Sequence, residues 1–75
     1  MKANYELLQT QFGAHLKRLR EAKGLSLMDL AIKIDSDDSY LSKIENGKKN
    51  IQISTIFQLA KGLELHPKDL LSFDV

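Results

Sequence analysis

Residues 24–48 read GLSLMDLAIKIDSDDSYLSKIENGK and contain two short helical patterns separated by a turn. Ser26, followed three residues later by Asp29, forms a capping-box pattern, in which each side chain accepts a hydrogen bond from the other residue's backbone amide. The apolar positions after this start recur at helical spacing: Leu27, Leu30, Ala31 and Ile34. We therefore predict a helix that opens at Ser26 and ends at Asp35.

A second helix is predicted after the turn. Asp37 is a strong N-cap candidate, because its carboxylate can accept a hydrogen bond from an amide of the first helical turn. The helix should span residues 38–45, with Leu41 and Ile44 as its inward pair. Gly47 should help to end it, since glycine readily adopts a positive φ.

Upstream of this pair, residues 4–23 have the pattern of one longer amphipathic helix. Apolar residues stand at positions 5, 8, 12, 16 and 19, which is helical spacing. Asn4 is a plausible N-cap, and Gly24 stops the helix. Gly13 lies inside the pattern, where glycine costs about 1 kcal/mol relative to alanine, so the helix could break there.

Downstream of residue 48, two more helices are predicted. Residues 53–62 carry an apolar pattern, and Pro67 fits the first turn of a short fifth helix. No segment alternates with period two and no linker divides the chain, so we expect an all-α, five-helix fold in a single domain over residues 1–75. The expected core positions include Phe12, Leu16, Leu30, Leu41, Ile44, Phe57 and Leu63.

The composition narrows the possible functions. The 75 residues carry a net charge of +1, which argues neither for nor against a nucleic-acid partner. The absence of cysteine excludes disulfides, thiolate metal ligands and a cysteine nucleophile. The chain has no apolar run of the roughly 20 residues that a membrane helix needs, and its start lacks the apolar stretch of a signal peptide. We expect a cytoplasmic protein with no membrane segment.

Catalytic and metal-binding patterns are weak. Residues 35–39 resemble the start of a calcium loop, but the glycine and glutamate of that motif are replaced by Tyr40 and Asn46. His15 and His66 are too few for a metal site without cysteines, and we expect them to be exposed or, for His66, to cap a helix. No glycine-rich elbow surrounds any serine. We therefore expect no enzyme, no metal, no cofactor and no small-molecule substrate.

The sequence resembles the Cro/phage-repressor (Xre) family of helix-turn-helix DNA-binding domains from about Phe12 to Leu71. The resemblance is carried by GLS at 24–26, LA at 30–31, YLSKIENGK at 40–48, LAK at 59–61 and PKDLL at 67–71. It implies a five-helix lambda-repressor-like domain whose helix-turn-helix covers about residues 26–46. In such domains the third helix lies in the major groove of double-stranded DNA. The implied function is transcriptional regulation through a roughly palindromic operator bound by a homodimer.

The expected base-reading residues lie on the third helix. Positions 38, 39, 42 and 43 of that helix point away from the Leu41/Ile44 side. The resemblance places Asp38, Ser39 and Lys43 at the family's main reading positions. It also lets Tyr40 reach a backbone or a thymine methyl. Lysine can donate to guanine, serine can donate or accept, and aspartate can accept from the amino group of cytosine. The predicted set is Asp38, Ser39, Tyr40, Ser42 and Lys43.

Phosphate contacts are expected beside the third helix and near the end of the first, and they would carry most of the salt-dependent affinity. The candidates are Arg18, Lys23, Asn46, Lys48 and Lys49. Arg20 and Glu45 match an arginine–glutamate pair that joins these two helices in the family. A glutamate beside DNA would repel phosphate, so an ion pair with Arg20 would explain why a glutamate stands at position 45.

The chain departs from the family pattern around the turn. Leu27 stands where the family often has a phosphate-contacting glutamine, Asp35 replaces the usual turn glycine, and Ser36 fills a commonly apolar position, which should loosen the packing of the turn. Asp37 and Asp38 suit a helix N-terminus but not a phosphate backbone. Either Asp38 reads cytosine, or the domain binds DNA weakly, or its partner is not DNA.

The C-terminal apolar residues exceed what a core of this size should cover, and exposed apolar area usually marks an interface. We expect a homodimer through Leu70, Leu71, Phe73 and Val75. Tyr5, Leu7 and Leu8 form a second candidate surface. Two functions stay open: a sequence-specific transcriptional regulator, and a protein-interaction module such as an antitoxin-like partner with weak DNA binding.

Overall fold

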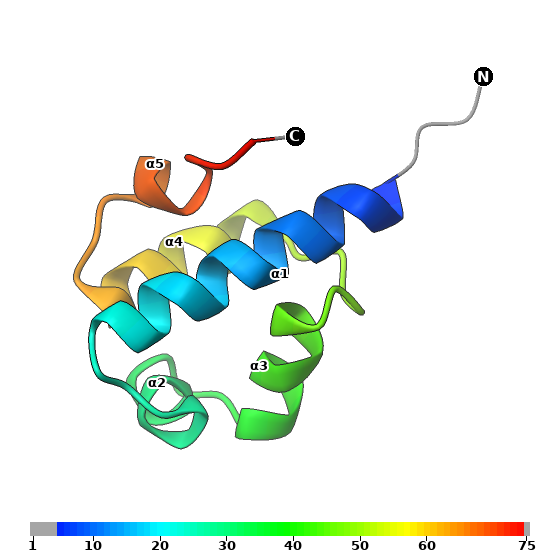
Figure 1. Cartoon of the computed structure of the whole chain (residues 1–75). Coiled ribbons are helices and arrows are strands. Elements are labelled where there is room, and N and C mark those ends of the chain that lie inside the picture. The colour runs from blue at the N-terminus through cyan, green and yellow to red at the C-terminus, as the bar shows by residue number, and fades with distance from the viewer. Residues whose placement is uncertain (1–4, 75) are drawn as a thin grey trace.

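The computed structural model describes residues 5–74, which form five α-helices. They are α1 (Tyr5–Ala22), α2 (Leu27–Lys33), α3 (Asp38–Glu45), α4 (Ile53–Leu63) and α5 (Pro67–Leu70). The long helix α1 crosses the molecule, with α2 and α3 together on one side of it and α5 on the other (Figure 1). Residues 5–74 contain no strand, so the predicted all-α class is confirmed. Asn4, the expected N-cap of α1, lies outside the described residues.

The starts of α2 and α3 follow the predicted capping chemistry. The Asp29 amide donates to Ser26 Oγ at 3.0 Å, and the Ser26 amide donates to Asp29 Oδ2 at 2.9 Å. The Tyr40 amide donates to Asp37 Oδ1 at 2.7 Å. These bonds satisfy amides that have no partner within the helix, so local sequence fixes where both helices begin.

The helix ends differ slightly from the prediction. Helix α2 stops at Lys33, before the expected Asp35, and Asp35 takes a left-handed conformation with φ 55° in the turn. Aspartate tolerates this region better than most residues, so the missing turn glycine is accommodated. Helix α4 ends at Leu63, with Glu64 in the left-handed region. Helix α1 continues through Gly13 without a break.

One hydrophobic core is shared by all five helices. The large side chains that are fully buried are Leu16, Leu30, Leu41, Ile44, Leu59, Leu63 and Leu70. Phe12, Ala31, Ile34 and Ala60 complete the core. The predicted inward pair of α3, Leu41 and Ile44, is confirmed.

Two apolar residues lie in a different environment from the one predicted from the sequence. Phe57 was expected in the core, but its side chain is 59% exposed, because α4 packs through Leu59, Ala60 and Leu63 instead. Leu70 was expected at a dimer interface, but it is fully buried, because α5 packs against both α1 and α4. The small core therefore covers more of the C-terminal region than the composition indicated.

Both histidines make hydrogen bonds to the backbone of α5. His66 caps this helix as predicted, with its Nδ1 accepting from the Lys68 amide at 3.1 Å. His15 was expected to be exposed, but it is half-buried and its Nε2 donates to the Asp69 carbonyl oxygen at 2.7 Å. The His15 ring thereby links α1 to α5. Among residues 5–74, no helix is long and apolar enough to cross a bilayer.

Candidate nucleic-acid interface

The outer face of α3 carries the predicted base-reading residues. Asp38, Ser39 and Lys43 are exposed, whereas Leu41 and Ile44 are buried on the opposite side of the same helix. A helix with a bare polar face and an anchored apolar face has the form that enters a major groove. These three side chains are free of the core and can reach a ligand that lies along α3.

Tyr40 and Ser42 are less accessible than the other members of the set. Both are half-buried, and Tyr40 packs against the core. The ammonium group of Lys49 lies 5.9 Å from the centre of the Tyr40 ring, within the range of a cation–π contact. Tyr40 therefore helps to hold Lys49 of the following loop beside α3.

The Asn46 side chain makes hydrogen bonds at the C-terminal end of α3, where Asn46 is the C-cap residue. Its Nδ2 donates to the Ser42 carbonyl oxygen at 2.9 Å and to Ser42 Oγ at 3.3 Å. A phosphate oxygen needs a hydrogen-bond donor, so the Asn46 side-chain amide would have to break its hydrogen bonds to Ser42 in order to contact a phosphate. Lys48 and Lys49 follow Gly47 and are exposed.

The C-terminal end of α3 is tied to α1 by a buried ion pair. Arg20 Nε donates to Glu45 Oε2 at 2.7 Å and Arg20 Nη2 donates to Glu45 Oε1 at 3.0 Å, a bidentate geometry. The two side chains are 8% and 5% exposed. Arg20 Nη1 also donates to the Leu25 carbonyl oxygen at 2.7 Å. The hydrogen bonds that Arg20 donates to the Glu45 carboxylate raise the pKa of Arg20 above its ordinary value, so the guanidinium stays charged.

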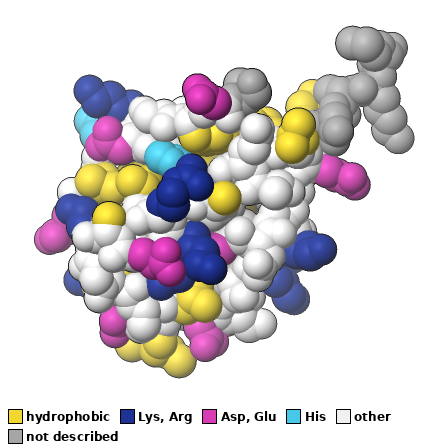
Figure 2. All heavy atoms as spheres, in the orientation of Figure 1, with side chains coloured by type: hydrophobic (Ala, Val, Ile, Leu, Met, Phe, Trp, Pro, Cys, Tyr) yellow, Lys and Arg dark blue, Asp and Glu magenta, His cyan; other side chains and the backbone are white. Residues whose placement is uncertain are grey.

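The surface charge is divided along α3. Asp37 and Asp38 stand at its start, whereas Lys43, Lys48 and Lys49 stand at or beyond its last turns. Acidic and basic side chains also alternate on the face that carries α1 (Figure 2). A phosphate backbone would therefore be attracted at the C-terminal end of α3 and repelled at its start.

The structure separates two basic residues of α1 that are adjacent in the sequence. Arg18 lines a groove beside the C-terminal segment, together with His15, Ser72 and Asp74. Lys17 lies one turn from both Gly13 and Arg20, which contact the end of α3. Lys17 is exposed and shares that face of α1, whereas Arg18 lines the groove beside the C-terminal segment. Helical spacing relative to Arg20 could have indicated this choice in the sequence.

Lys23 lies in the turn between α1 and α2 and is exposed. It follows the last residue of α1 and precedes the capping box at Ser26, so it stands near the start of α2. The expected phosphate contacts thus fall into three groups: Asn46, Lys48 and Lys49 at or after the end of α3, Lys23 before α2, and Arg18 beside the C-terminal segment.

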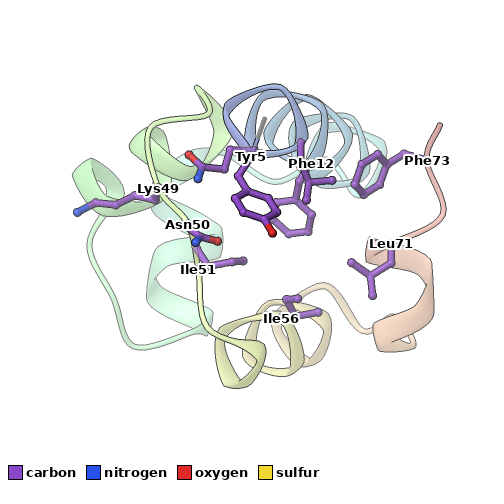
Figure 3. A pocket seen from close by; sticks show the side chains of 10 residues that line it. Tyr5, Phe12, Lys49, Asn50, Ile51, Ile56, Leu71 and Phe73 are labelled. Carbon is purple, nitrogen blue, oxygen red and sulfur yellow. The ribbon is translucent and has the colours of Figure 1, made fainter. Parts of the chain in front are cut away.

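An apolar groove of about 130 Å³ lies on another side of the molecule (Figure 3). Tyr5 and Phe12 come from α1, Ile51 comes from the loop before α4, Ile56 comes from α4, and Leu71 follows α5. Their side chains point toward a common hollow, whereas Lys49 points away from it (Figure 3). This meeting of segments from both ends of the chain was not predicted from the sequence.

Comparison with known proteins agrees with this geometry. A family profile described as a helix-turn-helix domain matches residues 11–73. The chain is 38% identical to the control protein C.MunI of a Mycoplasma species over 66 residues, covering 87% of this chain and 89% of that protein. It is 36% identical to the control protein C.BamHI of Bacillus amyloliquefaciens over 74 residues, covering 97% of this chain and 88% of that protein.

Solved structures show the same similarity. The crystal structure of the restriction-modification controller protein C.AhdI from Aeromonas hydrophila aligns with a TM-score of 0.87 and 35% identity, covering 91% of this chain and 99% of that one. The clp gene regulator ClgR from C. glutamicum aligns with a TM-score of 0.81 and 30% identity, covering 85% of this chain and 83% of that one. The chain belongs to the Cro/Xre-like helix-turn-helix family.

Proposed function

We propose that this chain is a homodimeric, sequence-specific transcriptional regulator of the restriction-modification controller kind. C.MunI and C.BamHI are control proteins, and C.AhdI is a restriction-modification controller protein. The observation that carries the proposal is the state of α3. Its outer face is exposed and polar, while its inner face and C-terminal end are held by the core and by the Arg20–Glu45 pair. A rigidly held polar helix is suited to reading base edges.

The base-reading role is proposed for Asp38, Ser39 and Lys43, with Tyr40 and Ser42 in supporting positions. Phosphate contact is proposed for Lys48, Lys49, Lys23 and Lys17. Such a regulator would act where its operator DNA lies, which fits the cytoplasmic location expected from the sequence. Its proposed operator lies in the promoter of restriction and modification genes.

Dimerisation is proposed through α4 and the segment after α5. Ile53, Phe57 and Leu71 are 74%, 59% and 56% exposed. Ile56 of α4 lines the same groove as Leu71, so α4 lies beside the C-terminal segment, and Ile53 and Phe57 are exposed on the same helix as Ile56. Exposed apolar area of this kind usually marks an interface. Burial of this surface against a second copy of the chain would stabilise a homodimer.

This surface replaces part of the interface expected from the sequence. Leu70 is buried in the core, and Phe73 is half-buried, with its ring 6.1 Å from Phe12 and 5.4 Å from His15 between ring centres. Val75 lies outside the described residues. Of the three C-terminal residues that the structure describes, Leu71 is the one whose exposure supports the proposal.

Selection of binding sites from a random DNA pool tests the proposal. We expect a two-fold symmetric site whose half-sites are about 34 Å apart, one helical turn, because a dimer would present two α3 helices. Affinity for the selected duplex should exceed affinity for a random duplex by about a thousandfold or more in physiological salt. Footprinting on promoters of restriction and modification genes then tests the proposed operator. A pool that yields no enriched sequence would contradict DNA recognition.

A second function is favoured by two observations. The two carboxylates at the start of α3 repel phosphate, and Met28 and Ile32 leave apolar side chains exposed on α2. A protein-interaction module with weak DNA binding would use these features. It would bind selected and random duplexes alike, with an affinity that falls equally for both as salt is added.

A further inference from the structure

The C-terminal end of α3 rests on one face of α1, which we call the α1 contact face (Thr10, Gly13 and Arg20). Arg20 holds the Glu45 side chain through the bidentate ion pair. The backbone of Gly47, just after α3, lies against Thr10, because a Cβ on Gly47 would fall 2.7 Å from Thr10 Oγ1. The three residues recur at helical spacing, so they form one stripe along α1.

Gly13 is the point of closest approach in this stripe. A Cβ on Gly13 would fall 2.5 Å from the Glu45 carbonyl oxygen and 2.8 Å from its carbonyl carbon, and it would also collide with the Ile44 carbonyl oxygen. All three atoms belong to the backbone of α3. A backbone cannot move aside by changing a rotamer, so a side chain at position 13 forces α3 away from α1.

Gly62 provides a contrast within the same molecule. A Cβ there would meet Ile34 Cγ2 at 2.6 Å and Leu30 Cδ1 at 3.1 Å, which are side-chain atoms. Side chains can repack, so alanine at position 62 disturbs the core without directly displacing a helix backbone. The two glycines are therefore a matched pair that separates loss of packing from displacement of α3.

We infer that Gly13 is a positioning residue for DNA recognition, which sets how far α3 projects from α1. The inference rests on the proposed function of α3. Glycine inside a helix is unfavourable, so its presence in α1 is explained by the contact it permits. Base-edge contacts need short, directed hydrogen bonds, whereas lysine–phosphate contacts tolerate a shift because the side chains are long and flexible. Displacement of α3 should therefore reduce base recognition more than it reduces general attraction to DNA.

The test compares Gly13→Ala, Gly62→Ala and the wild type on two duplexes at low temperature. One duplex is selected from a random pool by the wild-type protein, and the other is of random sequence. Circular dichroism first checks that each protein is folded. We expect Gly13→Ala to be folded and to lose about tenfold or more in affinity for the selected duplex, which corresponds to one impaired base contact. Its affinity for the random duplex should change by much less.

Gly62→Ala is the control for loss of packing without displacement of α3. Gly62→Ala should melt at a lower temperature than the wild type but keep the wild-type preference for the selected duplex. If Gly13→Ala keeps that preference as well, or if it fails to fold at low temperature, Gly13 does not act through helix placement and the inference is wrong. If the wild type itself shows no preference, the proposed function fails first, which is a different result.

Discussion

Asp38 is the residue of α3 whose chemistry is least expected beside DNA. It stands exposed at the start of the helix, next to the capping carboxylate of Asp37. The capping bond to Tyr40 explains Asp37, because that carboxylate satisfies a helix amide. No such bond accounts for Asp38 among the contacts described for residues 5–74. Its role must therefore be decided by its effect on binding.

Asp38→Ala should relax the base preference at one position of the selected site, by about 1–3 kcal/mol, if the carboxylate accepts from a cytosine amino group. Affinity for random DNA should rise, because a negative charge is removed near phosphates. Fluorescence anisotropy on a panel of single-base variants measures both effects. Lys48→Ala is the control: it should weaken all sequences similarly and reduce the salt slope by about one unit. An equal rise in affinity for every sequence would show that Asp38 reads nothing.

Lys17 and Arg18 allow a test between neighbouring charges. Lys17 shares the α1 face that contacts α3, whereas Arg18 lines a groove beside the C-terminal segment. Lys17→Ala should lower the affinity for DNA and reduce the salt slope by about one unit, and Arg18→Ala should leave both unchanged. Titrations at several salt concentrations provide the measurement. The opposite ranking would place the DNA backbone on the C-terminal side of α1.

At the scale of elements, the Arg20–Glu45 pair joins α1 to α3. Glu45→Ala would leave the Arg20 charge buried with the Leu25 carbonyl as its remaining partner. Stranding one member of a buried pair costs about 3 kcal/mol or more. In a domain of this size the melting temperature should fall by about 12 °C or more. Glu45→Gln keeps an oxygen acceptor and should lose less. An unchanged melting temperature for Glu45→Ala would show that the pair does not hold α3.

Helix α2 should contribute a pH-dependent part of the stability through Asp29. Its hydrogen bonds with Ser26 lower the pKa of the Asp29 carboxyl below its ordinary value. Because the folded pKa is the lower one, ionised Asp29 stabilises the fold above the unfolded value of about 3.9, and this contribution disappears as the pH falls through the folded pKa. Asp29→Asn keeps a carbonyl acceptor and removes the titration. Melting curves in acid should therefore fall less steeply for the variant; parallel curves would assign the acid sensitivity to other carboxylates.

At the scale of the whole molecule, the proposed dimer depends on apolar side chains that the monomer leaves exposed. Phe57→Glu places a charge in the α4 part of that surface and should convert a dimer to a monomer in sedimentation experiments at micromolar concentration. Ile32→Glu is the matched control, because Ile32 is 69% exposed but lies on α2. The control should remain dimeric. A wild-type protein that sediments as a monomer at every concentration, or a dimer that dissociates through Ile32, would contradict the proposed interface.

Local sequence determined the parts of this protein that depend on neighbours in the chain. The caps at Ser26, Asp37 and His66 are set by residues two or three positions away, so the starts of α2, α3 and α5 were predictable. The inward pair of α3 followed from helical spacing. The family followed from YLSKIENGK at its distance from the preceding helix, and the profile match over residues 11–73 confirmed it.

Only the tertiary structure decided which surfaces those helices share. Leu70 and Phe57 are both apolar and both lie in helical patterns, but packing of α5 against α1 and α4 buries the first, while α4 turns the second outward. Gly13 looked like a weak point in α1, yet it is where the backbone of α3 comes closest. Periodicity within a helix shows which residues share a face, but the burial of that face depends on the helix that lies against it. In this chain that helix comes from a distant part of the sequence.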